Sequence, residues 1–344
     1  MRAAVSLVWL LTILNSLESL WAATIQLETQ RIGRAEISRV SMVGFAGVVE
    51  LIPVKGAQNY ELQVAIEKPA ASVDDESVVD WDIKFKVENK EYWIEVTGPQ
   101  NKETWRRMVG RNTYPKYRLK LLGPPVPVSL SWRELKLSSV GWASEIRAQA
   151  VQGEYLLQQG RGDLVLSLDR GKINVSEQAG SLDVAAFQAE VMVQNLDGSL
   201  KLHNFSGMSK VTRLQGDLNL KARLGVSKVD GVTGGVLFDN GKGALSIVAA
   251  GERLAGATES GSVKVEVKEK VDVRIKSKDG FVTVLTPPNS GAMVNVGSVE
   301  GDLFVPNTFK VERVADLKVA SGRLPGAAGG LIHVRTETAG VKVR

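Results

Sequence analysis

The side chains that most often carry out chemistry in proteins are scarce in this chain. It has 344 residues but no cysteine, and its only histidines are His203 and His333. Cysteine nucleophiles and cysteine-ligated metals are therefore excluded, and a serine–histidine–acid arrangement would have to use one of these two histidines. No nucleophile-elbow motif accompanies them. We expect both histidines to be exposed or in loops, and we predict no catalytic residue, no metal site and no cofactor.

Lysines recur at a fixed spacing in the second half of the chain. Lys201, Lys210, Lys228 and Lys264 are separated by multiples of nine residues. If 18 residues make one turn of a stacked structure, Lys210 and Lys228 lie ~4.8 Å apart on adjacent turns, and Lys264 lies two turns further on the same face. Like charges this close are unfavourable unless solvent or an anionic partner intervenes. The lysines therefore predict contact with an anionic envelope polymer; the alternative is that they keep an exposed strand face soluble.

A second candidate binding surface combines an aromatic ring with two cations, in Trp105, Arg106 and Arg107. Tryptophan could stack on sugar rings, but the tryptophans beyond residue 22 are all found before residue 143 and could instead form the core of an N-terminal cap. The net charge of +5 is a mild excess and not the composition of a nucleic-acid-binding protein. We expect no nucleic-acid partner.

The elements that position these side chains repeat every nine residues. From Ser144 to Gly261, 11 of the 14 positions spaced nine apart are glycine, the exceptions being Ser144, Ala189 and Glu252. The residues two and four positions after each of these heads are nearly always apolar, whereas those between them are mostly polar. Alternation with period two predicts a short strand with one buried face, and glycine suits the turn that follows.

Strands this short cannot fold alone, so successive units must stack. Ser209 and Ser227 interrupt the same apolar column 18 residues apart, which indicates that two units form one coil of about 18 residues. The sequence therefore predicts an all-β fold, a parallel β-solenoid with an irregular strand-rich section before it. A fold of this kind places function on a surface and not in a deep pocket.

The chain divides into three parts by composition. Residues 1–22 have a basic start, an apolar run from Ala3 to Leu14 and small residues at Ala22 and Ala23, as a secretory signal peptide does; an uncleaved anchor is the alternative. Residues 23–143 are strand-rich but irregular, a cap or separate β domain, and residues 144–344 hold the repeats and a less regular C-terminal cap. We expect an extracytoplasmic protein, in the periplasm, at the cell surface or secreted, with no membrane-spanning segment after cleavage.

The strands resemble those of a known group of proteins. Segments such as Gly162-Asp-Leu-Val-Leu166, Gly180-Ser-Leu-Asp-Val184 and Gly301-Asp-Leu-Phe-Val305 follow the pattern Gly-x-Leu/Val-x-Val. Tandem strands of this form after a signal peptide resemble the bacterial putative-adhesin family of β-solenoid envelope proteins. The resemblance implies an exported, non-enzymatic adhesin or envelope scaffold, with an anionic polysaccharide or a surface protein as partner. It implies no catalytic residues.

Two other functions compete with this interpretation. A carbohydrate-active β-helix enzyme acting on an acidic polysaccharide would need a pair of acids, for which Asp230 and Asp239 are candidates. A purely structural envelope component would need neither acids nor a ligand. Calcium-binding nonapeptide rolls require aspartate at one fixed repeat position, and no repeat position here holds it consistently.

Overall fold

The computed structural model describes residues 22–69, 82–98, 114, 116–248, 251, 253–267, 270–327 and 329–344. Except for Ala22, the predicted signal peptide lies outside these residues. The chain forms two compact units, Met1–Ser138 and Ser139–Arg344. No helix of the described residues has the length and apolar character needed to cross a membrane.

The first unit is built from long strands and one short 3-10 helix, Arg34–Glu36. Its strands are β1 (Ala22–Gly33), β2 (Arg39–Pro53), β3 (Asn59–Pro69), β4 (Asp82–Glu88), β5 (Glu91–Thr97), β6 (Lys116–Gly123) and β7 (Val128–Val140). Strand β2 belongs to two groups of strands, because its first half pairs with β5 and its second half with β6, both in parallel. β4 pairs with β5, and β1 and β3 extend the side of β6, in antiparallel pairs.

Two glycines of β2 lie where a side chain would not fit. A Cβ atom at Gly44 would lie 2.5 Å from the ring of Trp132, and one at Gly47 would lie 2.6 Å from the carbonyl oxygen of Tyr117. Trp132 is almost fully buried, so its close approach to β2 depends on the missing side chains. At least this tryptophan belongs to a core, as the cap interpretation expects.

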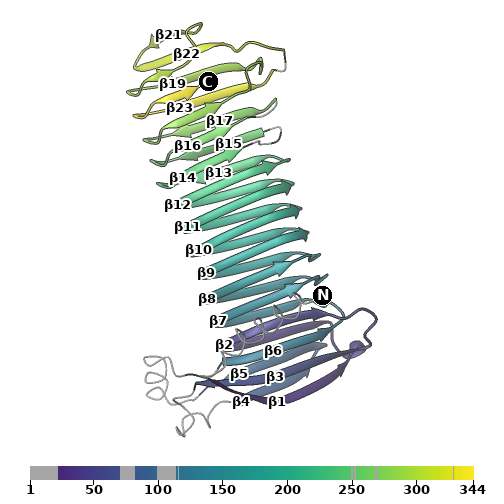
Figure 1. Ribbon diagram of the computed structural model, residues 1–344. Helices are drawn as coiled ribbons and strands as arrows, with labels where there is room; N and C mark the ends of the chain where they lie inside the picture. Colours follow the sequence, from purple (N-terminus) through teal and green to yellow (C-terminus); the bar gives the residue numbers. More distant parts are fainter. Residues whose placement is uncertain are drawn as a thin grey trace, which may run out of the picture. The chain divides into compact units, whose positions relative to one another are not determined.

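The second unit is a parallel β-solenoid, as the repeat predicts (Figure 1). The solenoid has about eight turns of roughly 18 residues between residues 128 and 285, so its first turn includes β7, which crosses the boundary between the units. The unit holds β8 (Ile146–Gln158), β9 (Leu164–Ala179), β10 (Leu182–Asp197), β11 (Leu200–Gln215), β12 (Leu218–Val232), β13 (Val236–Asn240), β14 (Ala244–Val248), β15 (Arg253–Thr258), β16 (Val263–Glu266), β17 (Asp272–Ser277), β18 (Val282–Leu285), β19 (Met293–Ser298), β20 (Leu303–Phe304), β21 (Lys310–Val314), β22 (Leu317–Arg323), β23 (Leu331–Thr336) and β24 (Val341–Val343).

The predicted 18-residue coil is confirmed by the strand register. Leu182 of β10 pairs with Leu164 on one side and Leu200 on the other, and both neighbours run parallel to it. The same column continues through Leu218 and Val236, and all five side chains are at most 3% exposed. Each buried aliphatic side chain stabilises the fold by roughly 1.5–3 kcal/mol, so these columns are the main source of stability in a chain without disulfides.

The strand pattern within each coil changes at β13. From β9 to β12 one strand continues through the corner between the two halves of a coil, whereas from β13 onward each half is a separate short strand. At these later corners a buried polar side chain donates a hydrogen bond to the carbonyl three residues on: Asn240 to Gly243 (2.7 Å), Thr258 to Gly261 (2.8 Å), Ser277 to Gly280 (2.6 Å) and Thr336 to Ala339 (2.6 Å). The side chain satisfies a buried backbone group that strand pairing leaves free.

Removing one of these corner side chains should cost stability. The Asn240 amide also donates to the Thr258 hydroxyl at 3.2 Å, and Asn240 is 1% exposed. Asn240→Ala should lower the free energy of unfolding by about 1–3 kcal/mol, because a buried carbonyl loses its donor. Urea denaturation followed by circular dichroism measures the loss. Asn219→Ala, at a half-buried outward position, is the matched control and should change stability by no more than about 0.5 kcal/mol; equal losses would contradict the explanation.

The last strands of the chain are not the last strands of the stack. β23 lies between β17 and β19 and pairs in parallel with both, and β24 lies in the same way between β18 and β20. On its other side β19 pairs with β22 in antiparallel fashion, and β22 forms a hairpin with β21. The parallel stack therefore changes to antiparallel pairing at this end (Figure 1).

Candidate binding surfaces of the solenoid

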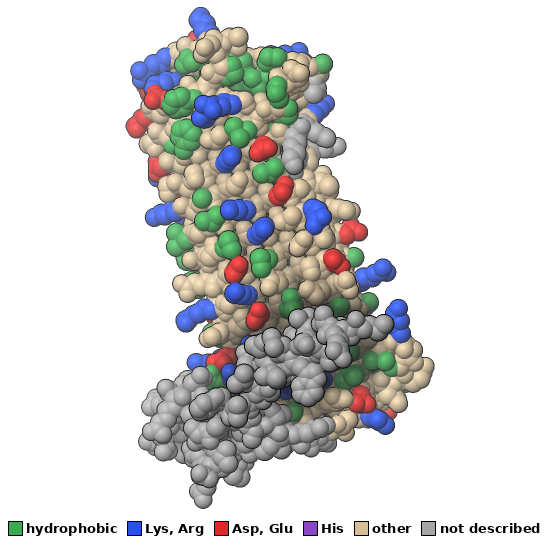
Figure 2. All heavy atoms as spheres, viewed as in Figure 1, with side chains coloured by type: hydrophobic (Ala, Val, Ile, Leu, Met, Phe, Trp, Pro, Cys, Tyr) green, Lys and Arg blue, Asp and Glu red, His purple; other side chains and the backbone are tan. Residues whose placement is uncertain are grey.

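In each strand, the residues three and five positions after the repeat head point outward, because they alternate with buried ones. Stacking of the coils arranges these outward side chains in rows. We call face A the side formed by the strands that follow Gly162, Gly180, Gly198, Gly216 and Gly234. Face B is the side formed by the strands that follow Gly171, Ala189, Gly207, Gly225, Gly243 and Gly261. Figure 2 shows basic, acidic and apolar side chains interspersed over the visible side of the coils. Any binding surface must therefore be found from strand register and not from net charge alone.

Three of the four predicted lysines share face B. Lys210 pairs in register with Lys228, Lys228 with Ser246, and Ser246 with Lys264. At a strand spacing of ~4.8 Å, Lys264 is two coils beyond Lys228, as the spacing predicts. All three are exposed, and none forms an ion pair with a described residue.

The row continues to a lysine that the repeat pattern did not reveal. Lys264 pairs with Thr283, and Thr283 pairs with Lys342 of the last strand. The alternation in Val341-Lys342-Val343 predicts an outward lysine, but its partner strand could not be identified, because the nine-residue register is lost after Val265. We call Lys210, Lys228, Lys264 and Lys342 the lysine stripe.

The fourth predicted lysine is on the opposite side. Lys201 lies on face A, where its ammonium is 2.8 Å from Asp183 Oδ2 on the neighbouring strand. This pair neutralises both charges locally, so Lys201 cannot extend the stripe. Trp105, Arg106 and Arg107 lie outside the described residues.

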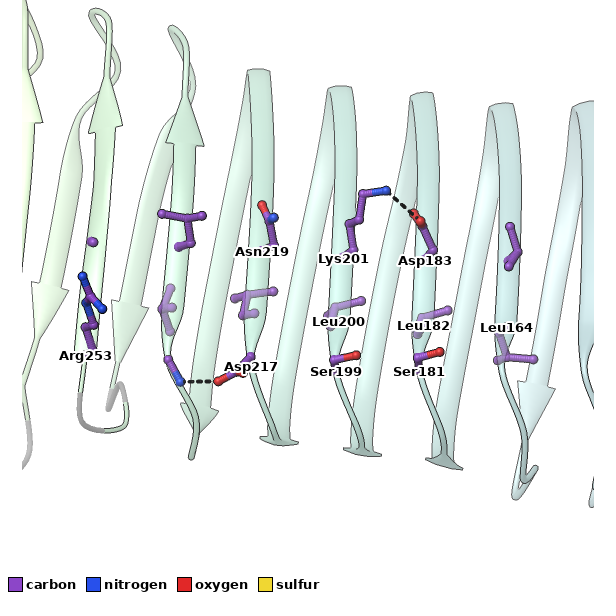
Figure 3. Close-up of a pocket in the computed structure, with 16 residues that line it drawn as sticks. Leu164, Ser181, Leu182, Asp183, Ser199, Leu200, Lys201, Asp217, Asn219 and Arg253 are labelled. Carbon is purple, nitrogen blue, oxygen red and sulfur yellow. Dashed lines mark hydrogen bonds and ion pairs between the residues drawn. The ribbon is translucent and has the colours of Figure 1, made fainter.

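An open groove of about 760 Å³ runs across the coils on face A (Figure 3). The buried column of Leu164, Leu182, Leu200, Leu218 and Val236 lies along it. The residue just after each head glycine is small in several coils, as at Ser181, Ser199 and Gly235, and this leaves the space open. The groove is thus a product of the repeat.

The two carboxylates in this groove are already engaged, and the groove also holds the exposed Arg253. Asp183 pairs with Lys201, and Asp217 Oδ1 accepts a hydrogen bond from the Gly235 amide at 2.7 Å (Figure 3). General acid–base catalysis requires a titratable group whose proton is available to a substrate. The geometry fits an extended, mostly apolar contact better than it fits catalysis.

The two candidate acids of the enzymatic alternative do not lie together. Asp230 pairs in register with Thr212 on face B, whereas Asp239 pairs with Lys221 on face A. The buried interior of the solenoid separates the two carboxylates, so they cannot act on one glycosidic bond. Within the described residues, no three His, Asp or Glu side chains come close enough to hold a metal ion.

Both histidines lie on strands of face A and not in loops. Burial lowers the pKa of His203, and the neighbouring Lys221 and Lys201 lower it further. Burial also lowers the pKa of His333, with Arg335, Arg274 and Lys276 adding to the effect. Each side chain is half-buried, so the expectation of exposed or loop histidines was wrong in its placement. A lowered pKa favours the neutral form of each imidazole.

Comparison with known proteins gives similarity in structure only. No family model matches the chain, and no curated protein matches it. A putative cell adhesion protein from Clostridium sporogenes matches with 11% identity and a TM-score of 0.19 over 94% of this chain and 98% of that one. A putative adhesin from Bacteroides fragilis matches with 13% identity and a TM-score of 0.30 over 77% and 97%. One from Parabacteroides merdae matches with 11% identity and a TM-score of 0.33 over 92% and 95%. Two of these structural neighbours are described as putative adhesins and one as a putative cell adhesion protein.

Proposed function

We propose that this chain is a non-enzymatic binding or scaffold protein that works outside the cytoplasm and contacts an anionic component of the cell envelope. The observation that carries the proposal is the lysine stripe. Its lysines share one outward row of face B, in which Ser246 and Thr283 occupy the intervening coils, and no described carboxylate forms an ion pair with them. A rigid row of weak sites binds a repeating polymer with more strength than any single site, because each further contact is intramolecular.

The lack of neutralising partners supports a ligand-binding role over a structural one. Two lysines in register repel each other unless an anion lies between them, and face A shows that the fold readily places an acid beside a lysine, as in Asp183 and Lys201. The two candidate acids of the enzymatic alternative lie on different faces, and no observation favours that alternative.

Charge reversal in the stripe should weaken binding to an acidic polysaccharide. Lys210→Glu combined with Lys228→Glu should reduce retention on immobilised polygalacturonate at least tenfold, and added salt should weaken binding by the parent protein. The affinity measured by isothermal titration with soluble polygalacturonate checks the same effect. A matched control, Lys221→Glu combined with Lys276→Glu, changes two exposed lysines of face A and should leave the affinity unchanged.

Equal binding by the parent and the stripe variant would refute the proposal. Release of shortened or unsaturated products from polygalacturonate by the parent protein would instead support the enzymatic alternative.

A further inference from the structure

Five large apolar side chains are exposed together at one edge of the solenoid, in three consecutive coils. We call this group the apolar ridge; its members are 40–49% exposed and comprise Phe187, Phe205, Met208, Leu224 and Val226. They lie on β10, β11 and β12 at the corner where face A turns into face B. Isolated exposed apolar residues are normal on protein surfaces, but a contiguous group marks an interaction site.

The two phenylalanine rings are stacked on each other. Their centroids are 4.8 Å apart and their planes differ by 10°. Each ring therefore covers one face of its neighbour. Sugars stack on open ring faces, and this stacking leaves each phenylalanine at most one such face. Exposed apolar side chains beside cations are suited to entering the apolar boundary of a membrane.

Cations flank the ridge on face B. Met208 and Val226 pair in register, and Lys210 and Lys228, two residues further along the same strands, pair in register beside them. Lys242, at the corner of the next coil, is exposed as well. The surface thus places a strip of apolar side chains directly beside a strip of unpaired lysines.

This combination specifies the chemistry of its partner. An acidic polysaccharide would use the lysines and leave the ridge in water, whereas a neutral apolar partner would leave the lysines without a counter-charge. An anionic lipid surface offers headgroup charge and an acyl-chain boundary side by side, and so matches both strips. Amphipathic surfaces of proteins bind such interfaces by burying apolar side chains near the headgroups while basic residues contact the anionic lipids.

We propose that the apolar ridge and the adjoining lysines dock this solenoid on an anionic lipid bilayer. The inference rests on the proposed function and names the partner of one part of the lysine stripe. The phenylalanines and Met208 enter the boundary between headgroups and acyl chains, and Lys210, Lys228 and Lys242 contact the anionic headgroups. Each lysine near such a surface strengthens binding roughly fivefold, from about 1 kcal/mol per charge.

Vesicle co-sedimentation tests the docking with the full chain. The parent should bind phosphatidylcholine vesicles that contain phosphatidylglycerol at least tenfold more strongly than vesicles of phosphatidylcholine alone. Phe187→Ser with Phe205→Ser should weaken this binding at least tenfold. Lys210→Gln with Lys228→Gln should weaken it about 25-fold, the product of two fivefold contributions.

A control pair changes apolar exposure on the other face. Val165→Ser with Leu237→Ser alters two face A side chains that are 39% and 53% exposed, and vesicle binding should stay at the parent level. Circular dichroism spectra identical to the parent show that each variant is folded.

Four results would overturn the inference. If the ridge variant binds vesicles as the parent does, the phenylalanines do not insert. If the parent binds polygalacturonate but no vesicle, the proposed function stands and the lipid partner is wrong. If the parent binds no vesicle and sedimentation velocity shows a dimer that the ridge variant does not form, the ridge is an interface between two copies of this chain. Binding to neither polygalacturonate nor vesicles refutes both proposals.

Discussion

Gly171→Val should destabilise the solenoid by about 3–5 kcal/mol. Gly171 has a φ of +132°, a region that side chains with a Cβ atom rarely occupy, and adopting it costs of order 1–3 kcal/mol. A Cβ atom there would also overlap the carbonyl oxygen of Gly153 on the preceding coil. Neither residue can move away without breaking the parallel register of β8 and β9, in which Gly153 and Gly171 are partners.

Two control variants separate the strain from the collision. Gly56→Ala introduces a side chain at a φ of +74° with no atom within 4 Å, so it should cost only about 1 kcal/mol from backbone strain. Ala189 occupies the register position of Gly171 in the next coil without a positive φ, and Ala189→Gly should cost about 1 kcal/mol or less. The midpoint of urea unfolding measures all three. A Gly171→Val protein as stable as the parent would show that the coils can separate locally.

Leu202→Ala should lower the free energy of unfolding by about 2–5 kcal/mol. Leu202 is 0% exposed and packs inside β11 in a column with Val184 and Leu220. Its truncation removes apolar contact and leaves a cavity that neighbouring coils, held in register on both sides, cannot easily fill. Because each coil contacts only its neighbours, the loss should appear first as faster amide hydrogen exchange in β10, β11 and β12.

The same substitution at an outward position is the control. Leu237 is 53% exposed on β13, so Leu237→Ala should change stability by no more than about 0.5 kcal/mol. If both variants lose the same stability, the interior columns are not what holds the coils together.

The nine-residue repeat alone was enough to predict the coil and the arrangement of three of the four lysines of the stripe. Glycine heads and alternating apolar residues are local signals, and a constant period places every later residue once the number of residues per turn is known. Ser209 and Ser227 indicated that number, and the structure pairs them in adjacent strands. The same arithmetic places Lys210, Lys228 and Lys264 on face B. It also places Lys201 on face A, but it cannot show that Asp183 neutralises Lys201.

The backbone conformation of several corners could not be predicted from the sequence. Gln159, Glu177, Asn195 and Arg213 all adopt φ values of 54–56° at one corner of successive coils. Apart from asparagine, these residue types do not favour that conformation. Stacking imposes it, since each corner must follow the one beneath it. The hydrogen bonds of the Asn240 and Thr258 side chains could not be predicted either, because an isolated polar residue near a glycine also fits an ordinary exposed turn.

The sequence by itself determined the class of fold, the length of the coil and the side on which each repeated side chain lies, because a strict period converts position in the chain into position in space. Only the tertiary structure decided where the period fails. It placed β23 between β17 and β19 and brought Lys342 onto the lysine stripe. These arrangements depend on which strand pairs with which across long stretches of chain, and the free energy of such pairing comes from packing that no local pattern of residues records.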